Sequence, residues 1–251
     1  MRGLAERAAP GRARRAGSMC GRFTIADEAG AIGEAFGARV EPLRGVRLPR
    51  YNVAPTDEVP VVIAAPEGRR AGPMRWGLVP HWAESPKVGA RMINARAESV
   101  LKRRAYREPF LARRCLVPAD GFYEWEARAS GKQPYWIHRP GSRLFAMAGI
   151  WAMWRPPAGT RLASFSILTQ VAPPALGWLH DRVPVILPET VWDDWLARGT
   201  TPRVLDSILA ETSPPELRLH PVARAVNRAG YDEPDCIEEV ELADEAVRPG
   251  S

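Results

Sequence analysis

Eight short segments dominate the pattern of this sequence, and each is rich in β-branched and aromatic residues. Pro, Gly or Asp residues bound them, as is typical of β-strands separated by turns. Helical patterns do not alternate with these segments, so a parallel sheet of βαβ units is disfavoured and an antiparallel one is expected. The predicted strands are 58–65, 72–79, 114–117, 121–126, 134–138, 144–154, 164–171 and 183–187.

Few segments show the periodicity of a helix. Residues 27–37 place apolar side chains at helical spacing and end at a glycine, and residues 188–197 begin with a proline. Residues 95–106 and 201–211 are also predicted helices. Strands outnumber helices, so the expected fold class is α+β: a single domain with a curved, largely antiparallel, barrel-like β-sheet core flanked by short helices.

The net charge of +6 is concentrated at the N-terminus. Residues 1–18 contain five arginines and one glutamate, so they supply +4 and the remaining chain only +2. Such a weak excess does not by itself indicate a nucleic-acid partner. The segment also lacks the apolar stretch of roughly 7–15 residues that a secretory signal needs. We expect a disordered basic tail at 1–18, absent from the mature protein, and a second tail at 241–251.

Two further observations concern compartment and metal content. No apolar run approaches the roughly 20 residues needed to span a bilayer, so no membrane association is expected. The three cysteines, Cys20, Cys115 and Cys236, lie far apart and form no C-x-x-C pair. An odd count of isolated thiols fits a reducing cytoplasm, and neither a metal nor another cofactor is expected.

Met19-Cys20 is the segment with the most unusual chemical reactivity. If translation begins at Met19, removal of that Met leaves Cys20 as the terminal residue. An α-amine has a pKa of about 7.7–8.0, against roughly 10.4 for lysine, so much of it is the free base at neutral pH. Such an amine attacks aldehydes, and the adjacent thiolate closes the imine into a thiazolidine. The alternative is a buried structural cysteine.

Three other segments carry reactive groups outside an obvious core pattern. Asn94 and Arg96 can line one side of an extended stretch, where an Arg can reach a phosphate. Glu124 lies among aromatic residues, where burial would raise its pKa into a general-acid range, although a solvated strand residue is the alternative. His180 precedes an apolar strand and titrates near neutrality, but it could equally be a surface or capping residue.

Taken in order, seven segments of the chain resemble the SOS response-associated peptidase family, the abasic-site processing proteins. The resemblance runs from Met19 to roughly Ile237 and assigns the family domain to residues 19–240. The matching segments are MCGRF (19–23), RYNVAP (50–55), RWGLVP (75–80), INARAES (93–99), CLVPADGFYEW (115–125), HDRVPVIL (180–187) and HPVARAVN (220–227).

The resemblance implies a covalent reaction with abasic sites in single-stranded DNA. Cys20 would be the nucleophile that forms a thiazolidine with the ring-opened sugar. Asn94 would position the amine and the sugar, and Glu124 would act as acid and base during Schiff-base formation. His180 would assist ring opening and reversal of the crosslink.

The resemblance also implies a DNA-binding surface on a monomeric protein that associates with the nucleoid when bound to DNA. Two groups of residues would form this surface. Phosphates beside the lesion would pair with Arg22, Arg96 and Arg182, and the path of the strand would be shaped by Asn52, Pro55 and Trp82.

The eighteen residues before Met19 conflict with this chemistry, because a Cys20 nitrogen in an amide is not nucleophilic. Three explanations remain: a true start at Met19, autoproteolytic removal of the tail, or a chain that cannot crosslink. Two other functions also stay open. One is a cysteine-type peptidase that uses the Cys20 thiolate with His180 as base. The other is a non-catalytic single-stranded DNA-binding module. A metal-dependent nuclease is disfavoured because no Asp/His cluster has ligand spacing.

Overall fold

The central strands of the larger β-sheet close into a barrel. In this computed structural model, which describes residues 21–141, 144–156 and 159–242, five strands form a ring in the order β11–β10–β7–β4–β5. Consecutive strands in this order are antiparallel, and a parallel pairing of β5 with β11 at Trp76 and Phe165 completes the ring. These strands are β4 (Glu58–Ala65), β5 (Gly68–Trp76), β7 (Arg114–Ala119), β10 (Phe145–Trp154) and β11 (Leu162–Val171).

Four short strands extend the ring. Strand β6 pairs with the later part of β11, where Arg96 lies opposite Thr169. Strand β12 also pairs there, with Pro184 opposite Thr169. The segments that carry Asn94 and Arg182 therefore both reach the same end of β11. The four strands are β2 (Ala38–Arg39), β6 (Asn94–Arg96), β12 (Arg182–Pro184) and β13 (Ile186–Leu187).

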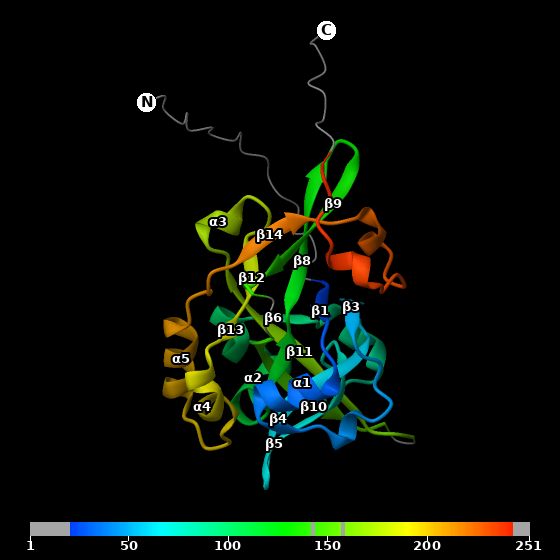
Figure 1. The fold of residues 1–251 in the computed structure, drawn as a ribbon. Coiled ribbons are helices and arrows are strands. Elements are labelled where there is room, and N and C mark those ends of the chain that lie inside the picture. The colour runs from blue at the N-terminus through cyan, green and yellow to red at the C-terminus, as the bar shows by residue number, and fades with distance from the viewer. Residues whose placement is uncertain (1–20, 142–143, 157–158, 243–251) are drawn as a thin grey trace.

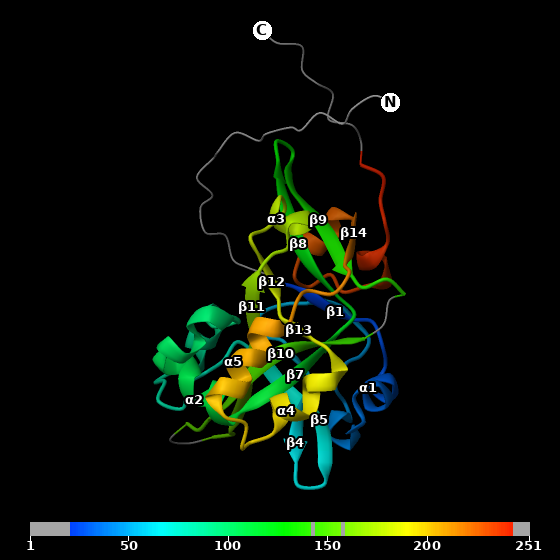
Figure 2. The ribbon, with the colours of Figure 1, turned by 90° about the vertical axis from the view of Figure 1, so that its left-hand side faces the viewer.

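A second, five-stranded antiparallel sheet has the order β14–β9–β8–β1–β3. Its β8–β9 hairpin stands at the top of the molecule, above the barrel (Figures 1 and 2). Only Asp120 separates β7 from β8, so the chain passes directly from the barrel into this sheet. The strands are β1 (Phe23–Ile25), β3 (Arg50–Val53), β8 (Gly121–Arg128), β9 (Gly131–His138) and β14 (Arg218–Pro221).

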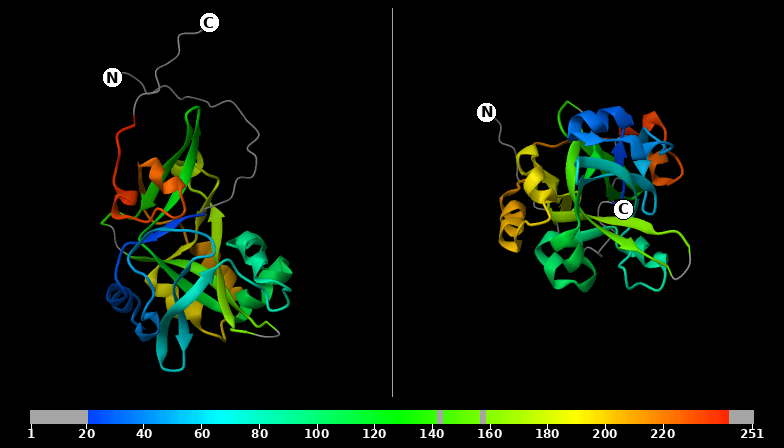
Figure 3. Two further views of the ribbon diagram at one scale, coloured as in Figure 1. Left: turned by 90° about the vertical axis from the view of Figure 1, so that its right-hand side faces the viewer. Right: turned by 90° about the horizontal axis from the view of Figure 1, so that it is seen from below.

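Short helices lie around the outside of the strands. Seen from below, α1, α2 and the α4–α5 pair occupy three different sides of the molecule (Figure 3). The α-helices are α1 (Ala29–Phe36), α2 (Arg104–Ala112), α3 (Pro174–Gly177), α4 (Trp192–Leu196) and α5 (Pro202–Glu211). The 3₁₀-helices are η1 (Glu41–Leu43), η2 (Pro86–Arg91), η3 (Ala97–Lys102), η4 (Glu189–Val191), η5 (Arg224–Asn227) and η6 (Pro234–Ile237).

The two sheets share one hydrophobic core. Trp76 of the barrel is fully buried, and its ring meets that of Phe23 edge-on, with centroids 4.9 Å apart. The Trp76 indole N–H donates to the carbonyl of Ile93 at 2.9 Å, so its polar atom is satisfied. Burying an aromatic side chain of this size contributes about 1.5–3 kcal/mol. This shared core makes the chain a single α+β domain, which confirms the expected fold class.

Arg114 joins the helices to the barrel. Its buried guanidinium donates to main-chain carbonyls of both α2 and the end of α4, including Phe110 at 2.8 Å and Trp195 at 2.6 Å. These carbonyls lie at helix C-termini, where helical partners are lacking. One cation therefore satisfies two helix ends and fixes both helices beside β7.

The predicted helix at 95–106 is wrong. Residues 94–96 are extended as β6, residues 97–102 form η3, and Arg103 interrupts the helical path with φ −97° and ψ 116°. Helix α2 begins only at Arg104. The cause is tertiary: the amide of Ile167 in β11 donates to the carbonyl of Ile93 at 3.0 Å, which holds the segment beside the barrel.

The predicted strand at 183–187 is divided in two. Val185 separates β12 from β13, and its main chain bonds to both neighbouring barrel strands. Its amide donates to the carbonyl of Leu168 in β11, and its carbonyl accepts from the amide of Ala148 in β10. The chain therefore crosses from one strand to the next at this residue.

Asp120 fastens the junction of the two sheets. Its buried carboxylate accepts hydrogen bonds from the hydroxyl of Thr24 and the amide of Ala26, both on or beside β1. Burial raises the pKa of this carboxyl to about 6, although these two hydrogen bonds act in the opposite direction. The folded protein therefore binds this proton more tightly than the unfolded chain does.

This raised pKa predicts a pH-dependent stability. The contribution of Asp120 is fully present below pH of about 4 and is lost as pH rises through about 6, because the unfolded carboxyl ionises first. We expect the free energy of unfolding of the native chain, relative to that of Asp120→Asn, to fall between pH 4 and pH 6. Denaturant titrations at intervals across this range would measure it. A constant difference between the two proteins would contradict the assignment.

Candidate active site

The register between β1 and β8 places the start of the described chain across from Glu124. Phe23 pairs with Phe122, and the amide of Tyr123 donates to the carbonyl of Arg22 at 3.0 Å. Continuing this antiparallel register by one pair sets Gly21 opposite Glu124. Cys20 itself lies outside the described residues, but it is bonded to Gly21. The predicted nucleophile is thus one residue from a position that faces the predicted acid.

Glu124 is buried in β8, with 3% of its surface exposed. Its cross-strand partner in β9 is Tyr135, and cross-strand partners point to the same face of a sheet. The ring of Tyr135 meets that of Trp178 edge-on at 5.5 Å. Trp178 belongs to the connection between α3 and β12. This contact brings that connection against the face of the sheet that carries Glu124.

His180 lies in the same connection, two residues after Trp178. Its Nδ1 accepts the amide N–H of Arg182 at 3.0 Å and lies 3.1 Å from a carboxylate oxygen of Asp181. A main-chain amide can only donate, so the neutral imidazole carries its proton on Nε2. Neutral His180 therefore presents Nε2 as a hydrogen-bond donor.

Asn94 and Arg96 lie on one extended segment, as the sequence predicted. In β6 their side chains alternate with that of the buried Ala95, which makes them neighbours on one face. Asn94 is half-buried, and its carbonyl accepts from the hydroxyl of Tyr106 at 3.1 Å. Arg96 is exposed. The structure therefore leaves Arg96 accessible and places Asn94 closer to the barrel.

Arg182, predicted to contact a phosphate, is held by partners within the protein. Its two terminal nitrogens bind the two carboxylate oxygens of Glu98 at 2.6 and 2.8 Å, and one of them also donates to the carbonyl of Thr169. Its side chain is 6% exposed. A bidentate ion pair already neutralises this guanidinium. These contacts hold β12 against β11 and η3, and the phosphate contact of Arg182 stays a prediction.

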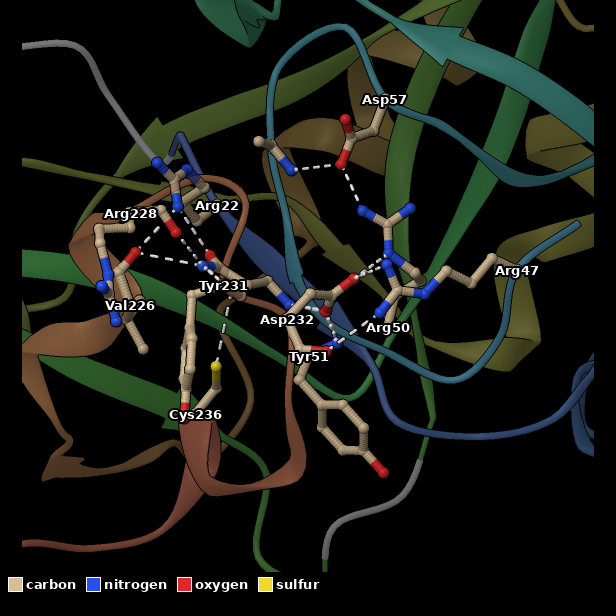
Figure 4. Close-up of polar contacts among 12 residues, drawn as sticks. Arg22, Arg47, Arg50, Tyr51, Asp57, Val226, Arg228, Tyr231, Asp232 and Cys236 are labelled. Carbon is tan, nitrogen blue, oxygen red and sulfur yellow. Dashed lines mark hydrogen bonds and ion pairs between the residues drawn. The ribbon is translucent and has the colours of Figure 1, made fainter.

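Arg22, in contrast to Arg182, has neutral hydrogen-bond partners. It is half-buried, and its Nη1 donates to the Asn52 side-chain oxygen at 2.8 Å and to the Val226 carbonyl at 3.0 Å (Figure 4). Both acceptors are neutral, and no carboxylate of the described residues lies within ion-pair distance. Burial lowers the pKa of this guanidinium, which shows the cost of holding its charge there. Its charge is thus available to an external anion.

Asn52 is fully buried, so any effect on DNA is indirect. Its side-chain nitrogen donates to three carbonyls of a C-terminal segment, those of Val226, Arg228 and Tyr231 (Figure 4). Its side-chain oxygen then faces Arg22. Asn52 therefore orients Arg22, and its predicted role in shaping the path of the DNA strand stays a prediction.

Pro55 and Trp82 lie on connections outside this cluster. Pro55 is half-exposed in the turn between β3 and β4, next to Thr56, whose φ is 79°. Trp82 is 46% exposed, and the guanidinium of Arg104 lies 5.0 Å from its ring centroid. Within the part of the chain that the structure describes, no hydrogen bond or ring contact joins Trp82 to the other predicted site residues.

Sequence reasoning missed two residues that hold predicted site residues in place. One is Glu98, whose motif was recognised but whose ion pair with Arg182 was not. The other is Asp232, which is buried and accepts the amides of Tyr51 and Asn52. The family motif that ends at Asn227 was the one available signal for the C-terminal segment, but no role was attached to it.

The described residues contain no group of three His, Cys, Asp or Glu side chains able to hold a metal ion. They also contain no helix that is long and apolar enough to cross a membrane.

A family model described as SOS response associated peptidase (SRAP) matches residues 19–229. The chain belongs to this family. SRAP proteins with curated names include the abasic site processing protein YoqW of Bacillus subtilis, which is 37% identical over 88% of this chain and 99% of its own length. The abasic site processing protein HMCES of Gallus gallus is 32% identical over 89% of this chain and 79% of its own length.

Solved structures share the fold of this chain. A Bacteroides thetaiotaomicron protein superposes with a TM-score of 0.77 at 22% identity, over 88% of this chain and all of that one. A phage-related protein of Bordetella bronchiseptica gives a TM-score of 0.64 at 30% identity, over 82% of this chain and 95% of that one.

Proposed function

We propose that this SRAP protein recognises abasic sites in single-stranded DNA and forms a reversible covalent crosslink through Cys20. The observation that carries the proposal is the juxtaposition of residue 21, where the described chain begins, with a buried acid. The register of β1 with β8, continued to Gly21, sets this residue opposite Glu124, and the half-buried charge of Arg22 has no carboxylate within ion-pair distance among the described residues. The names of the relatives YoqW and HMCES support the choice of an abasic site as the substrate.

The reaction begins at the α-amine of Cys20. An abasic site interconverts between a closed sugar and an open aldehyde. The amine adds to the aldehyde carbon, and loss of one water gives an imine. The thiol then adds across the C=N bond: sulfur bonds to the carbon, and its proton goes to the nitrogen. The product is a thiazolidine, and no oxidant or cofactor is consumed.

The neighbouring side chains have distinct parts in this scheme. Glu124 donates a proton to the departing water and accepts one from the attacking amine. Asn94 positions the amine and the open sugar. His180, whose neutral form has a donor at Nε2, assists opening of the sugar ring and the reverse reaction. General acid–base groups of this kind contribute about 10²–10⁴-fold each.

Arg22 and Arg96 are the two arginines that we assign to phosphates beside the lesion. Arg22 has a half-buried charge with neutral partners, and Arg96 is exposed on β6. Charge-assisted bonds to phosphate oxygens require no large net charge, which suits a chain whose net charge after residue 18 is only +2. Pro55 and Trp82 shape the path of the strand, the latter through an exposed ring on which a base can stack.

The proposed reaction shields a lesion that cannot template synthesis, and its reversibility keeps the adduct from becoming permanent. The protein acts as a monomer in the cytoplasm, and it associates with the nucleoid when it is bound to DNA. The reacting chain must start at Cys20. In the autoproteolytic route, the thiolate of Cys20 attacks the Met19 carbonyl and the peptide C–N bond breaks, so the α-amine takes up a proton and is freed as the thioester forms. Water then hydrolyses the thioester, which releases the Cys20 thiol and leaves a carboxylate on Met19.

The direct test uses a chain expressed from Met19, so that Met removal exposes Cys20. Incubated with single-stranded DNA that contains one abasic site, it should give a band of reduced mobility that survives heat on a denaturing gel. The matched control is the same oligonucleotide with a tetrahydrofuran spacer, which has no aldehyde and should give no band. Absence of a band with the true abasic site would refute the proposal.

A further inference from the structure

We propose that Asp232 is a positioning residue for the crosslinking reaction, acting through Asn52 on Arg22 and the chain start. This inference rests on the proposed function. It assigns a role to the C-terminal segment 222–237, which follows the last strand and lies behind the candidate site. Asp232 touches none of the groups proposed to react, so its contribution is through geometry.

The C-terminal segment packs on the sheet face opposite to Glu124. Side chains alternate along β8, so Tyr123 and Trp125 point away from the face that carries Glu124. The hydroxyl of Tyr123 donates to the carbonyl of Cys236 at 3.2 Å, and the indole of Trp125 donates to Asn227 at 2.6 Å. Both residues that flank Glu124 are therefore fixed by this segment from behind.

The same segment fixes Arg22 on the neighbouring strand. Its side chain also lies on the face opposite to Glu124, where it bonds to Val226. The Asn52 amide cannot be flipped, because its nitrogen is needed as donor to three carbonyls and its oxygen as acceptor for Arg22. The orientation of Arg22 thus depends on how Asn52 is held against the segment.

Asp232 is the group that holds Asn52 there. One carboxylate oxygen accepts the amides of Tyr51 at 2.6 Å and Asn52 at 2.8 Å, and the other binds the guanidinium of Arg50 (Figure 4). Arg50 also binds Asp57, in the turn that follows β3. The Asp232 side chain is 4% exposed. One oxygen of this buried carboxylate thus has neutral donors and the other has a charged donor, so the position of the side chain is strongly fixed.

These contacts link Asp232 through Asn52 to Arg22, which is two residues after Cys20 in the sequence. An imine forms only if the amine lies within reach of both the aldehyde and Glu124. A shift of about 1 Å in such a group can cost about 100-fold in rate. Loss of Asp232 should therefore slow the chemistry of Cys20 even though Asp232 lies on the far side of the sheet.

The test compares Asp232→Ala, Arg22→Ala and the double variant, each in a chain that begins at Cys20. We expect Asp232→Ala to slow adduct formation by about 10- to 100-fold. In the Arg22→Ala background the same change should have little further effect, because the two residues act on one path. Asp232→Asn, which keeps one oxygen for the Tyr51 and Asn52 amides, should recover part of the rate.

A second measurement does not depend on the adduct. The salt dependence of binding to single-stranded DNA reports the number of phosphates neutralised, with a slope of about −0.7 for each. Asp232→Ala and Arg22→Ala should each reduce the slope by about that amount, and the double variant should reduce it no further. A protein that is merely less stable keeps its slope.

Ile208→Ala is the matched control, because Ile208 is buried in α5 and takes no part in these contacts. It should lower stability and leave the adduct rate and the salt slope unchanged below its melting temperature. The inference is overturned if Asp232→Ala keeps the native slope, or if its defects add fully to those of Arg22→Ala. Absence of any adduct with the native chain would reject the proposed function instead, and the salt slopes would still decide the part played by Asp232.

Discussion

Acetylation of the Cys20 α-amine should abolish the heat-stable adduct with abasic DNA. Acylation delocalises the nitrogen lone pair into an amide, so no carbinolamine or imine can form, whereas the thiol remains free. The expected loss is complete, because the thiazolidine contains both atoms. The measurement is adduct yield on a denaturing gel, for chains that begin at Cys20 with and without the acetyl group.

Cys20→Ala separates the amine from the thiol. This variant keeps the α-amine, with an ordinary pKa of about 7.7–8.0, and can still form the imine. The imine should be lost on heating but retained after borohydride reduction. A cysteine peptidase has the opposite dependence, because it needs the thiolate and not the amine. An acetylated chain that still gives the stable adduct would exclude the thiazolidine.

Much of the fold follows from patterns within a few residues. Strand β4 was predicted with its observed bounds, because Pro and Gly punctuation and β-branched residues define it locally. Strand β9 differs from its predicted bounds only at its start, and β7 and β8 differ only at their ends. The segment after Ile93 could not be predicted in this way. Its local sequence favours a helix, but pairing with β11, more than 70 residues away, requires an extended chain.

The candidate site shows the same division between what local sequence predicts and what long-range pairing decides. Glu124 and Gly21 were matched to a family by local motifs, and their juxtaposition then follows from a strand register that no single motif contains. Arg182 could not be judged from sequence, because its carboxylate partner Glu98 is 84 residues distant. The Asn52 contacts with the C-terminal segment span more than 170 residues. Motifs thus indicate which residues matter, and long-range pairing decides which of the cations already have a carboxylate partner.

Glu124→Gln and His180→Ala should slow different steps of the crosslinking reaction. Glutamine has nearly the shape of glutamate but cannot transfer a proton, so adduct formation should slow by about 10²–10⁴-fold. The loss of a catalytic group raises the barrier in both directions, so release should slow in proportion. Adduct yield after long incubation should then match that of the native chain.

His180→Ala should slow release of the crosslink, and formation should slow with it, because His180 is assigned to sugar-ring opening as well as to the reverse reaction. The neutral imidazole has its donor at Nε2, because Nδ1 accepts the Arg182 amide, and the reverse reaction needs a proton donor at the opening adduct. Formation rate, release rate and equilibrium yield can each be measured by gel. A release rate equal to that of the native chain would contradict this role. If release falls while formation keeps its rate, detailed balance requires a matching rise in the equilibrium amount of adduct, and His180 then acts by destabilising the adduct.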